Sequence, residues 1–77
     1  MILTKVLRNK GNKLYHLRTS YEGKEYNVVL VDRGLNSIRV KVQEITYKKD
    51  KENFTFVRTG EIIPILKKEA IEFIKLN

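Results

Sequence analysis

The sequence predicts a mainly β protein: a small antiparallel SH3-like or OB-like barrel or half-barrel of five to six strands, with one C-terminal α-helix. Three observations predict this fold. Apolar residues alternate with a period of two through most of the chain, turn-forming residues separate the alternating stretches, and the period becomes helical only after Pro64. A chain of 77 residues forms a single domain, 1–77, with a small core.

The first two predicted strands, residues 2–8 and 14–21, form a hairpin. The intervening residues 9–13 hold a glycine between two asparagines, and both residue types tolerate the positive φ angles of tight turns. The odd-numbered residues of the second strand are mostly apolar or aromatic, so they are expected to point inward. This alternation turns His16 and Arg18 outward.

The third predicted strand, 25–31, is apolar enough to be buried on both faces, and residues 32–36 connect it to a long fourth strand, 37–47. Apolar residues occupy even positions of the fourth strand up to 42, but the odd positions at Ile45 and Tyr47. A slip of one residue without a turn signal is typical of a β-bulge. We therefore expect a bulged strand that bends, as in small barrels.

The fifth predicted strand, 53–58, follows the charged loop 48–52, and a helix is expected over 64–76. Residues 61–63 could add a short sixth strand. Proline suits the first turn of a helix, and the apolar residues that follow recur at helical spacing. These residues, which should pack on the sheet, are Leu66, Ala70, Phe73 and Ile74.

Residues 53–57, Asn-Phe-Thr-Phe-Val, resemble the aromatic strand of RNA-recognition and cold-shock domains, which implies that exposed phenylalanines stack on bases. The chain departs from that pattern, because no glycine precedes the segment and no aromatic residue follows two places later. It also lacks the two helices of the RNA-recognition fold. We therefore expect Phe54 and Phe56 to belong to the core. The overall layout is similar to that of small archaeal chromatin proteins.

Positive charge is concentrated in the first third of the chain. The net charge is +7, and residues 1–24 carry six lysines and arginines against a single acid, Glu22. Such a field attracts polyanions and gives salt-dependent binding. The sequence therefore favours a small, basic, non-enzymatic protein that binds DNA or RNA by its phosphate backbone.

The predicted contacts begin on the outward side of the first hairpin and continue along the fourth strand, where polar residues alternate with the apolar ones. Tyr47 borders the lysine loop and could stack on a base. The predicted nucleic-acid-binding residues are Arg8, Lys10, Lys13, His16, Arg18, Arg39, Lys41 and Tyr47.

Enzymatic functions find little support in the composition. A single histidine and no cysteine exclude a Cys–His pair and a multi-histidine metal site, so no metal, cofactor or catalytic residue is predicted. The isolated glycines belong to turns and form no phosphate-binding loop. One enzymatic alternative is a small ribonuclease that uses His16 as an acid–base group.

A protein-binding module is the other alternative. A tiny basic protein of a phage or mobile element could dock on an acidic surface of a host protein through its sheet edge or its helix. The longest apolar run, 28–31, is too short to cross a membrane, and no signal peptide is evident. We expect a cytoplasmic monomer or homodimer without a membrane partner.

Overall fold

The computed structural model describes residues 1–34 and 37–76, with side chains up to residue 75. Leu35 and Asn36 of the predicted 32–36 connection lie outside the described residues, as does Asn77. The elements are, in order, β1 (Ile2–Asn9), β2 (Asn12–Tyr21), β3 (Lys24–Asp32), β4 (Ile38–Lys48), β5 (Lys51–Val57) and α1 (Ile62–Leu76). The prediction of a mainly β chain with a C-terminal helix is confirmed.

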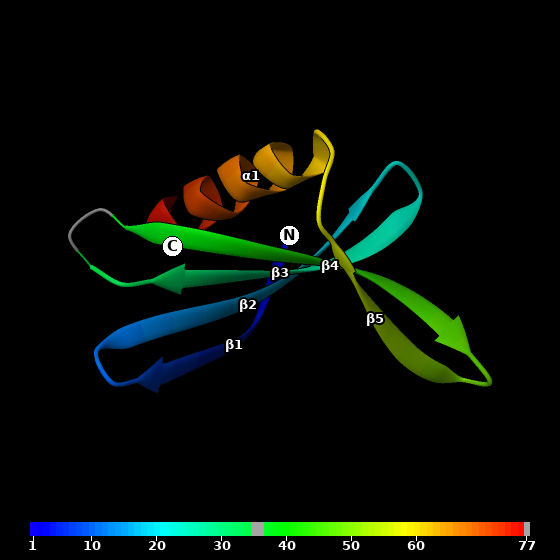
Figure 1. Cartoon of the computed structure of the whole chain (residues 1–77), viewed down its shortest axis with the longest axis horizontal. Coiled ribbons are helices and arrows are strands. Elements are labelled where there is room, and N and C mark those ends of the chain that lie inside the picture. Colours follow the sequence, from blue (N-terminus) through cyan, green and yellow to red (C-terminus); the bar gives the residue numbers. More distant parts are fainter. Residues whose placement is uncertain (35–36, 77) are drawn as a thin grey trace.

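The five strands form one antiparallel sheet in the order β1-β2-β3-β4-β5, so each strand pairs with its neighbours in the sequence. The sheet is open: β1 and β5 are its edges, and no pairing joins them within the described residues. Figure 1 shows the helix over one face, while the β1–β2 and β4–β5 hairpins diverge on the other side. The alternative of a short strand at 61–63 is wrong, because Ile62 and Ile63 already belong to the helix.

Three of the four strand connections are two-residue turns. In each turn both residues have positive φ angles: Lys10 and Gly11, Glu22 and Gly23, Lys49 and Asp50. This backbone conformation is that of type I′ turns, whose twist matches the right-handed twist of the paired strands. Tight turns therefore hold these three hairpins in one register.

The core lies between α1 and the sheet, because the helix packs on β3 and β4. Leu66 and Ala70 are fully buried on the helix, and the predicted apolar stripe with Phe73 and Ile74 is confirmed. The sheet contributes alternate residues of its three central strands to the same cluster: Leu17, Tyr26, Val28, Leu30 and Val42. The helix thus covers its own sheet.

The predicted bulge in the fourth strand is wrong. The pairing of β4 with β3 runs without a shift from Ile38 to Ile45, and β4 pairs with β5 without a shift as well. Ile45 is only 4% exposed, yet it lies outside the helix-side cluster, because it belongs to the opposite face of the sheet. The change of phase therefore marks a second apolar area and not a distortion of the strand.

The sheet does contain an irregularity, in β1 between Leu3 and Lys5. Leu3 pairs with Leu17 and Lys5 with His16, which leaves Thr4 as the extra residue. The Thr4 hydroxyl donates a hydrogen bond of 3.0 Å to the carbonyl oxygen of His16. The bulge at an edge strand adds to the local twist of the sheet.

Candidate functional site

The sheet face that the helix leaves uncovered, called the open face below, is built by strict alternation. Residues of β2 that point away from the core pair with odd-numbered residues of β3, and these pair in turn with odd-numbered residues of β4. On β5 the even-numbered residues share this face. The polar and aromatic residues of the open face include Lys5, His16, Arg18, Ser20, Glu25, Asn27, Arg39, Lys41, Gln43, Tyr47, Glu52, Phe54 and Phe56.

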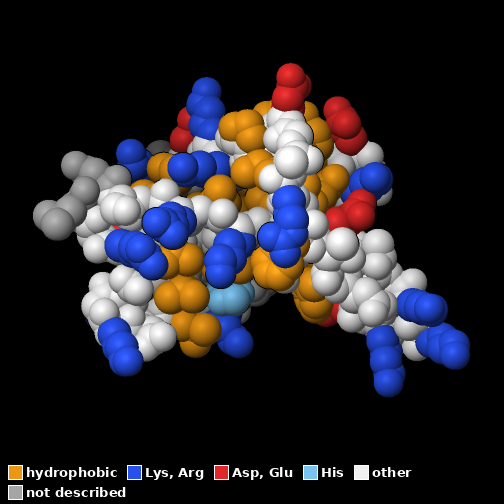
Figure 2. Space-filling model, in the orientation of Figure 1, with side chains coloured by type: hydrophobic (Ala, Val, Ile, Leu, Met, Phe, Trp, Pro, Cys, Tyr) orange, Lys and Arg blue, Asp and Glu red, His pale blue; other side chains and the backbone are white. Residues whose placement is uncertain are grey.

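One cross-strand row of the open face, called the cationic row below, carries a lysine at each end. The register places Lys5 beside His16, His16 beside Val29 and Val29 beside Lys41, and Arg39 lies two residues along β4. Lys5, Arg39 and Lys41 are exposed. Figure 2 shows lysine and arginine side chains gathered over the strands of the visible face, with the histidine among them.

The other predicted contacts of the first hairpin lie elsewhere. Arg8 pairs with Lys13, and Lys13 pairs with Asp32. This row ends at Ile38, which packs against the helix-side core, so the row belongs to the helix side of the sheet. The Lys13 ammonium lies 5.1 Å from the centroid of the Tyr15 ring. Lys10 is at the tip of the turn. The other three predicted cations of the hairpin therefore do not share one outward face with Arg18: Arg8, Lys10 and Lys13 surround the end of the hairpin.

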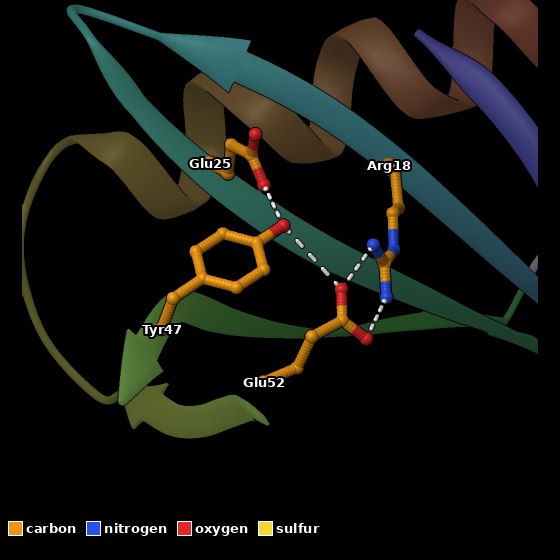
Figure 3. A network of polar contacts seen from close by, with 4 residues as sticks. All are labelled: Arg18, Glu25, Tyr47 and Glu52. Atoms are coloured by element: carbon orange, nitrogen blue, oxygen red, sulfur yellow. Dashed lines mark hydrogen bonds and ion pairs between the residues drawn. The ribbon is translucent and has the colours of Figure 1, made fainter. Parts of the chain in front are cut away.

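Arg18 and Tyr47 belong to a polar network that crosses the open face (Figure 3). Both terminal nitrogens of Arg18 donate to the carboxylate of Glu52, at 2.6 and 2.8 Å. The Tyr47 hydroxyl donates to Glu25 at 2.8 Å and lies 3.5 Å from Glu52. The guanidinium fork and the phenol are thus engaged within the protein, which makes Arg18 a positioning group more than a free phosphate contact.

The pKa values in this network follow from its hydrogen bonds. The bond from Arg18 holds the pKa of Glu52 below its usual range, and the bond to Glu25 raises the pKa of Tyr47. Glu52 is therefore an anion and Tyr47 a neutral phenol at neutral pH. The network adds negative charge at one end of the open face, opposite the cationic row.

Phe54 and Phe56 are exposed, at 45% and 48%, and the expectation that they belong to the core is wrong. They pair with Ile45 and Gln43 of β4 and point to the open face. An arginine lies over each ring: the guanidinium carbon of Arg18 is 5.9 Å from the centroid of Phe54, and that of Arg58 is 5.4 Å from the centroid of Phe56. The sequence held a signal for this aromatic surface: Ile45 and Tyr47 occupy odd positions of the fourth strand, whereas its earlier apolar residues occupy even positions.

A shallow hollow of about 410 Å³ joins the cationic row to the aromatic strand. Its walls come from β1, β2, β3 and β5, and the lining residues are Thr4, Lys5, His16, Arg18, Asn27 and Phe54. The Asn27 amide donates a hydrogen bond of 2.8 Å to the side-chain oxygen of Gln43, which fixes both amides in the middle of the open face. Charge, amide and aromatic groups thus meet at one place.

His16 is half-buried in this hollow. Its Nε2 atom is buried and has no hydrogen-bond partner within the described residues. Burial, and then the charge of Lys5, lower the pKa of His16, so the imidazole is neutral at neutral pH. Residues 1–34 and 37–76 bring together no group of three or more His, Cys, Asp or Glu side chains that could hold a metal ion.

The edge strand β1 carries an exposed apolar surface. Every residue of β1 is exposed, and its large apolar side chains are Ile2, Leu3, Val6 and Leu7. Because β1 pairs only with β2, its outer edge offers unpaired backbone groups. Such an edge can accept a further strand.

Comparison with known proteins gave no match to a protein-family model, a curated sequence or a solved structure. The function of the chain therefore has to be inferred from its own residues. In the described part of the chain, no helix has the length and apolar character that crossing a membrane requires.

Proposed function

We propose that this protein is a small, non-enzymatic nucleic-acid-binding protein that holds the phosphate backbone of DNA or RNA. The observation that carries the proposal is the unpaired charge of the open face. Among the described residues the ion pairs are Arg18–Glu52 and Lys24–Glu44. Lys5, Arg39 and Lys41 have no acidic partner there, and a polyanion would supply one.

The backbone would run along the open face and around the end of the first hairpin. Lys5 and Lys41 lie in one cross-strand row, with Arg39 beside it. The cations at the hairpin end, Arg8, Lys10 and Lys13, would extend the contacts. In this arrangement the sheet acts as a half-barrel whose concave side takes the strand. Arg18 remains bound to Glu52, and Tyr47 remains bound to Glu25.

The test is an anisotropy titration of the whole chain with labelled 20-mers: dT20, rU20 and a mixed-sequence duplex, across a salt series. Six phosphate contacts predict a slope of log K against log salt of about −4 for single strands and about −5 for a duplex. The double variant Lys5→Gln/Lys41→Gln should reduce the steepness of the slope by about 1.4 on single strands, because two contacts are lost.

The matched control is Lys68→Gln/Lys75→Gln, which removes the same charge from exposed positions of the helix. It should leave the slope unchanged. Absence of binding at low salt, or an equal effect of the two double variants, would contradict the proposal, because attraction by net charge alone does not depend on where the charge lies.

The exposed edge strand favours a second candidate function, a protein-binding module. A partner could add a strand to β1 and place its side chains against Val6 and Leu7. This function predicts a complex that survives nuclease treatment and is lost in Val6→Lys, while the double variant of Lys5 and Lys41 retains it. Binding to oligonucleotides that Val6→Lys leaves intact would favour the first function.

The ribonuclease alternative stays a prediction that depends on His16. A neutral imidazole can accept a proton, but its Nε2 atom is buried, so only Nδ1 could meet a substrate. Incubation of the protein with a labelled RNA decides the matter. Intact RNA is the expected result for a binding protein, and cleavage that His16→Gln abolishes would establish the alternative.

A further inference from the structure

The two exposed phenylalanines of β5 have no part in binding a phosphate backbone. Phe54 and Phe56 are about half exposed on the face that carries the cations. Exposed aromatic rings beside a basic surface are suited to a ligand that has both negative charge and flat apolar groups. We propose that the open face binds single-stranded nucleic acid and that Phe54 and Phe56 stack on its bases; this inference rests on the nucleic-acid-binding function proposed above.

The spacing of the two rings fits successive bases. Phe54 and Phe56 are two residues apart on one face of β5, so their Cβ atoms are separated by about 7 Å along the strand. An extended single strand can present neighbouring bases at such intervals, because its bases are not held in a continuous stack. The bases of a duplex are paired and stacked inside the helix, where side chains of a sheet surface do not reach their faces.

The arginines strengthen these platforms. The guanidinium group of Arg18 lies over Phe54, and that of Arg58 lies over Phe56. Each ring therefore has a cation near one side and solvent on its exposed part, where a base can stack. Glu52 fixes Arg18 through two hydrogen bonds, which keeps the cation over Phe54.

The hollow beside Phe54 supplies the other contacts that one nucleotide needs. Lys5 and the Asn27 amide line it together with Phe54. A base stacked on Phe54 would lie with its polar edge toward the amides of Asn27 and Gln43, which are joined by a hydrogen bond. Its phosphate would then lie toward Lys5. Amide side chains recognise the edges of unpaired bases in this way.

The experiment compares dT15 with a 15-base-pair duplex that contains the same strand. The wild-type chain should bind dT15 more tightly than the duplex. The variant Phe54→Leu/Phe56→Leu keeps apolar side chains but removes the aromatic faces, so its affinity for dT15 should fall at least about fivefold, since stacking contributes that much or more per base. Its salt slope should not change, because the phosphate contacts remain.

The control variant is Thr55→Val, which changes the exposed residue between the two rings on the other face of β5. It should bind as the wild type does. Tryptophan fluorescence provides a second measurement, which does not depend on variants with lower affinity. The chain has no tryptophan, so Phe54→Trp introduces a single fluorescent probe. Its fluorescence should be quenched by dT15 and unchanged by the duplex.

Equal affinity for dT15 before and after Phe54→Leu/Phe56→Leu would overturn the inference, as would tighter binding of the duplex or an unchanged tryptophan signal. The proposed function would survive those results if the variants of Lys5 and Lys41 still reduced binding. Failure of every oligonucleotide to bind at low salt would contradict the proposed function itself. Failure of the stacking inference and failure of the proposed function are therefore distinguishable.

Discussion

Arg18 of β2 and Glu52 of β5 bridge the open face, although two strands of the sheet lie between them. Their side chains are 34 positions apart in the sequence and meet through two hydrogen bonds of 2.6 and 2.8 Å. The twist of the sheet brings the first part of β5 toward β2, so this ion pair joins two strands that are not paired directly with each other. Both side chains are more than a third exposed, so solvent screens their attraction.

Release of Arg18 should make the binding of nucleic acid more strongly dependent on salt. In Glu52→Gln the carboxylate that occupies the guanidinium fork is lost, and one negative charge leaves the open face. The salt slope should become steeper by about 0.7 on dT20, because Arg18 can contact one more phosphate. Anisotropy titrations measure this change.

The control for Glu52→Gln is Glu72→Gln, which removes the same charge from an exposed position of α1. It should leave the slope as in the wild type. A slope that changes equally in both variants would mean that net charge, and not the freed Arg18, sets the affinity.

His16 should make the protein less stable in weak acid. Its pKa is lowered in the folded state by burial and by Lys5, so the unfolded chain binds the proton more readily. The stabilisation from the neutral imidazole is complete above the pKa of a free histidine, about 6.5. It is lost as the pH falls from there to the lowered pKa of the folded state.

Urea unfolding at pH 8 and pH 5.5 checks this prediction. The loss of stability between the two should be smaller in His16→Gln, which has no imidazole. It should also be smaller in Lys5→Gln, where the repelling charge is gone. A pH dependence that is the same in all three proteins would show that other groups cause it.

A substitution in the β4–β5 turn should make the protein more stable. Lys49 and Asp50 both have positive φ angles, whereas each of the other two hairpin turns has glycine at its second position. Asp50→Gly should raise the free energy of unfolding by about 0.5 kcal/mol, because glycine adopts the left-handed conformation without a steric penalty. The melting temperature should rise by about 2–4 °C.

Two variants separate turn geometry from charge. Asp50→Asn removes the charge but keeps a residue that tolerates positive φ, so its melting temperature should stay near that of the wild type. Gly23→Asp makes the reverse exchange in the β2–β3 turn, where Gly23 has a φ of 80°. It should lower the melting temperature, and a rise would contradict the argument.

The helix should supply much of the stability. Leu66 is fully buried between α1 and the sheet, so Leu66→Ala leaves a cavity and should cost about 2–5 kcal/mol. A chain of this size has a total free energy of unfolding of roughly 4–12 kcal/mol. Denaturant titration should find the variant close to unfolding, whereas Lys68→Ala on the exposed side of the helix should be nearly neutral. A loss below 1 kcal/mol for Leu66→Ala would mean that the helix packs loosely.

Local patterns were sufficient to predict most of the fold. Alternation placed Leu17 inward and Arg18 outward, and helical spacing identified Leu66 and Ala70 as the buried side of α1. These predictions succeeded because they depend on residues close in the sequence. The turn residues set the hairpins for the same reason.

The faces of the sheet could not be assigned from alternation alone. A period of two shows which residues share a face but not which face is covered, so Ile45 suggested a bulge and Phe56 a core position. The bond between Arg18 and Glu52 could not be predicted from local patterns, because it depends on the twist of the whole sheet. The position of Arg8 on the helix side follows only from the register of β1 with β2.

The meander order of the strands has a consequence for the biosynthesis of the chain. Each strand pairs with the one made immediately before it, so contact order is low and hairpins can form as soon as their residues are free. The helix is synthesised after all five strands. Until it emerges from the ribosome, the apolar side of the sheet has no cover, and a nascent chain that stalls before residue 62 would expose Leu17, Val28 and Val42 to aggregation and to chaperones.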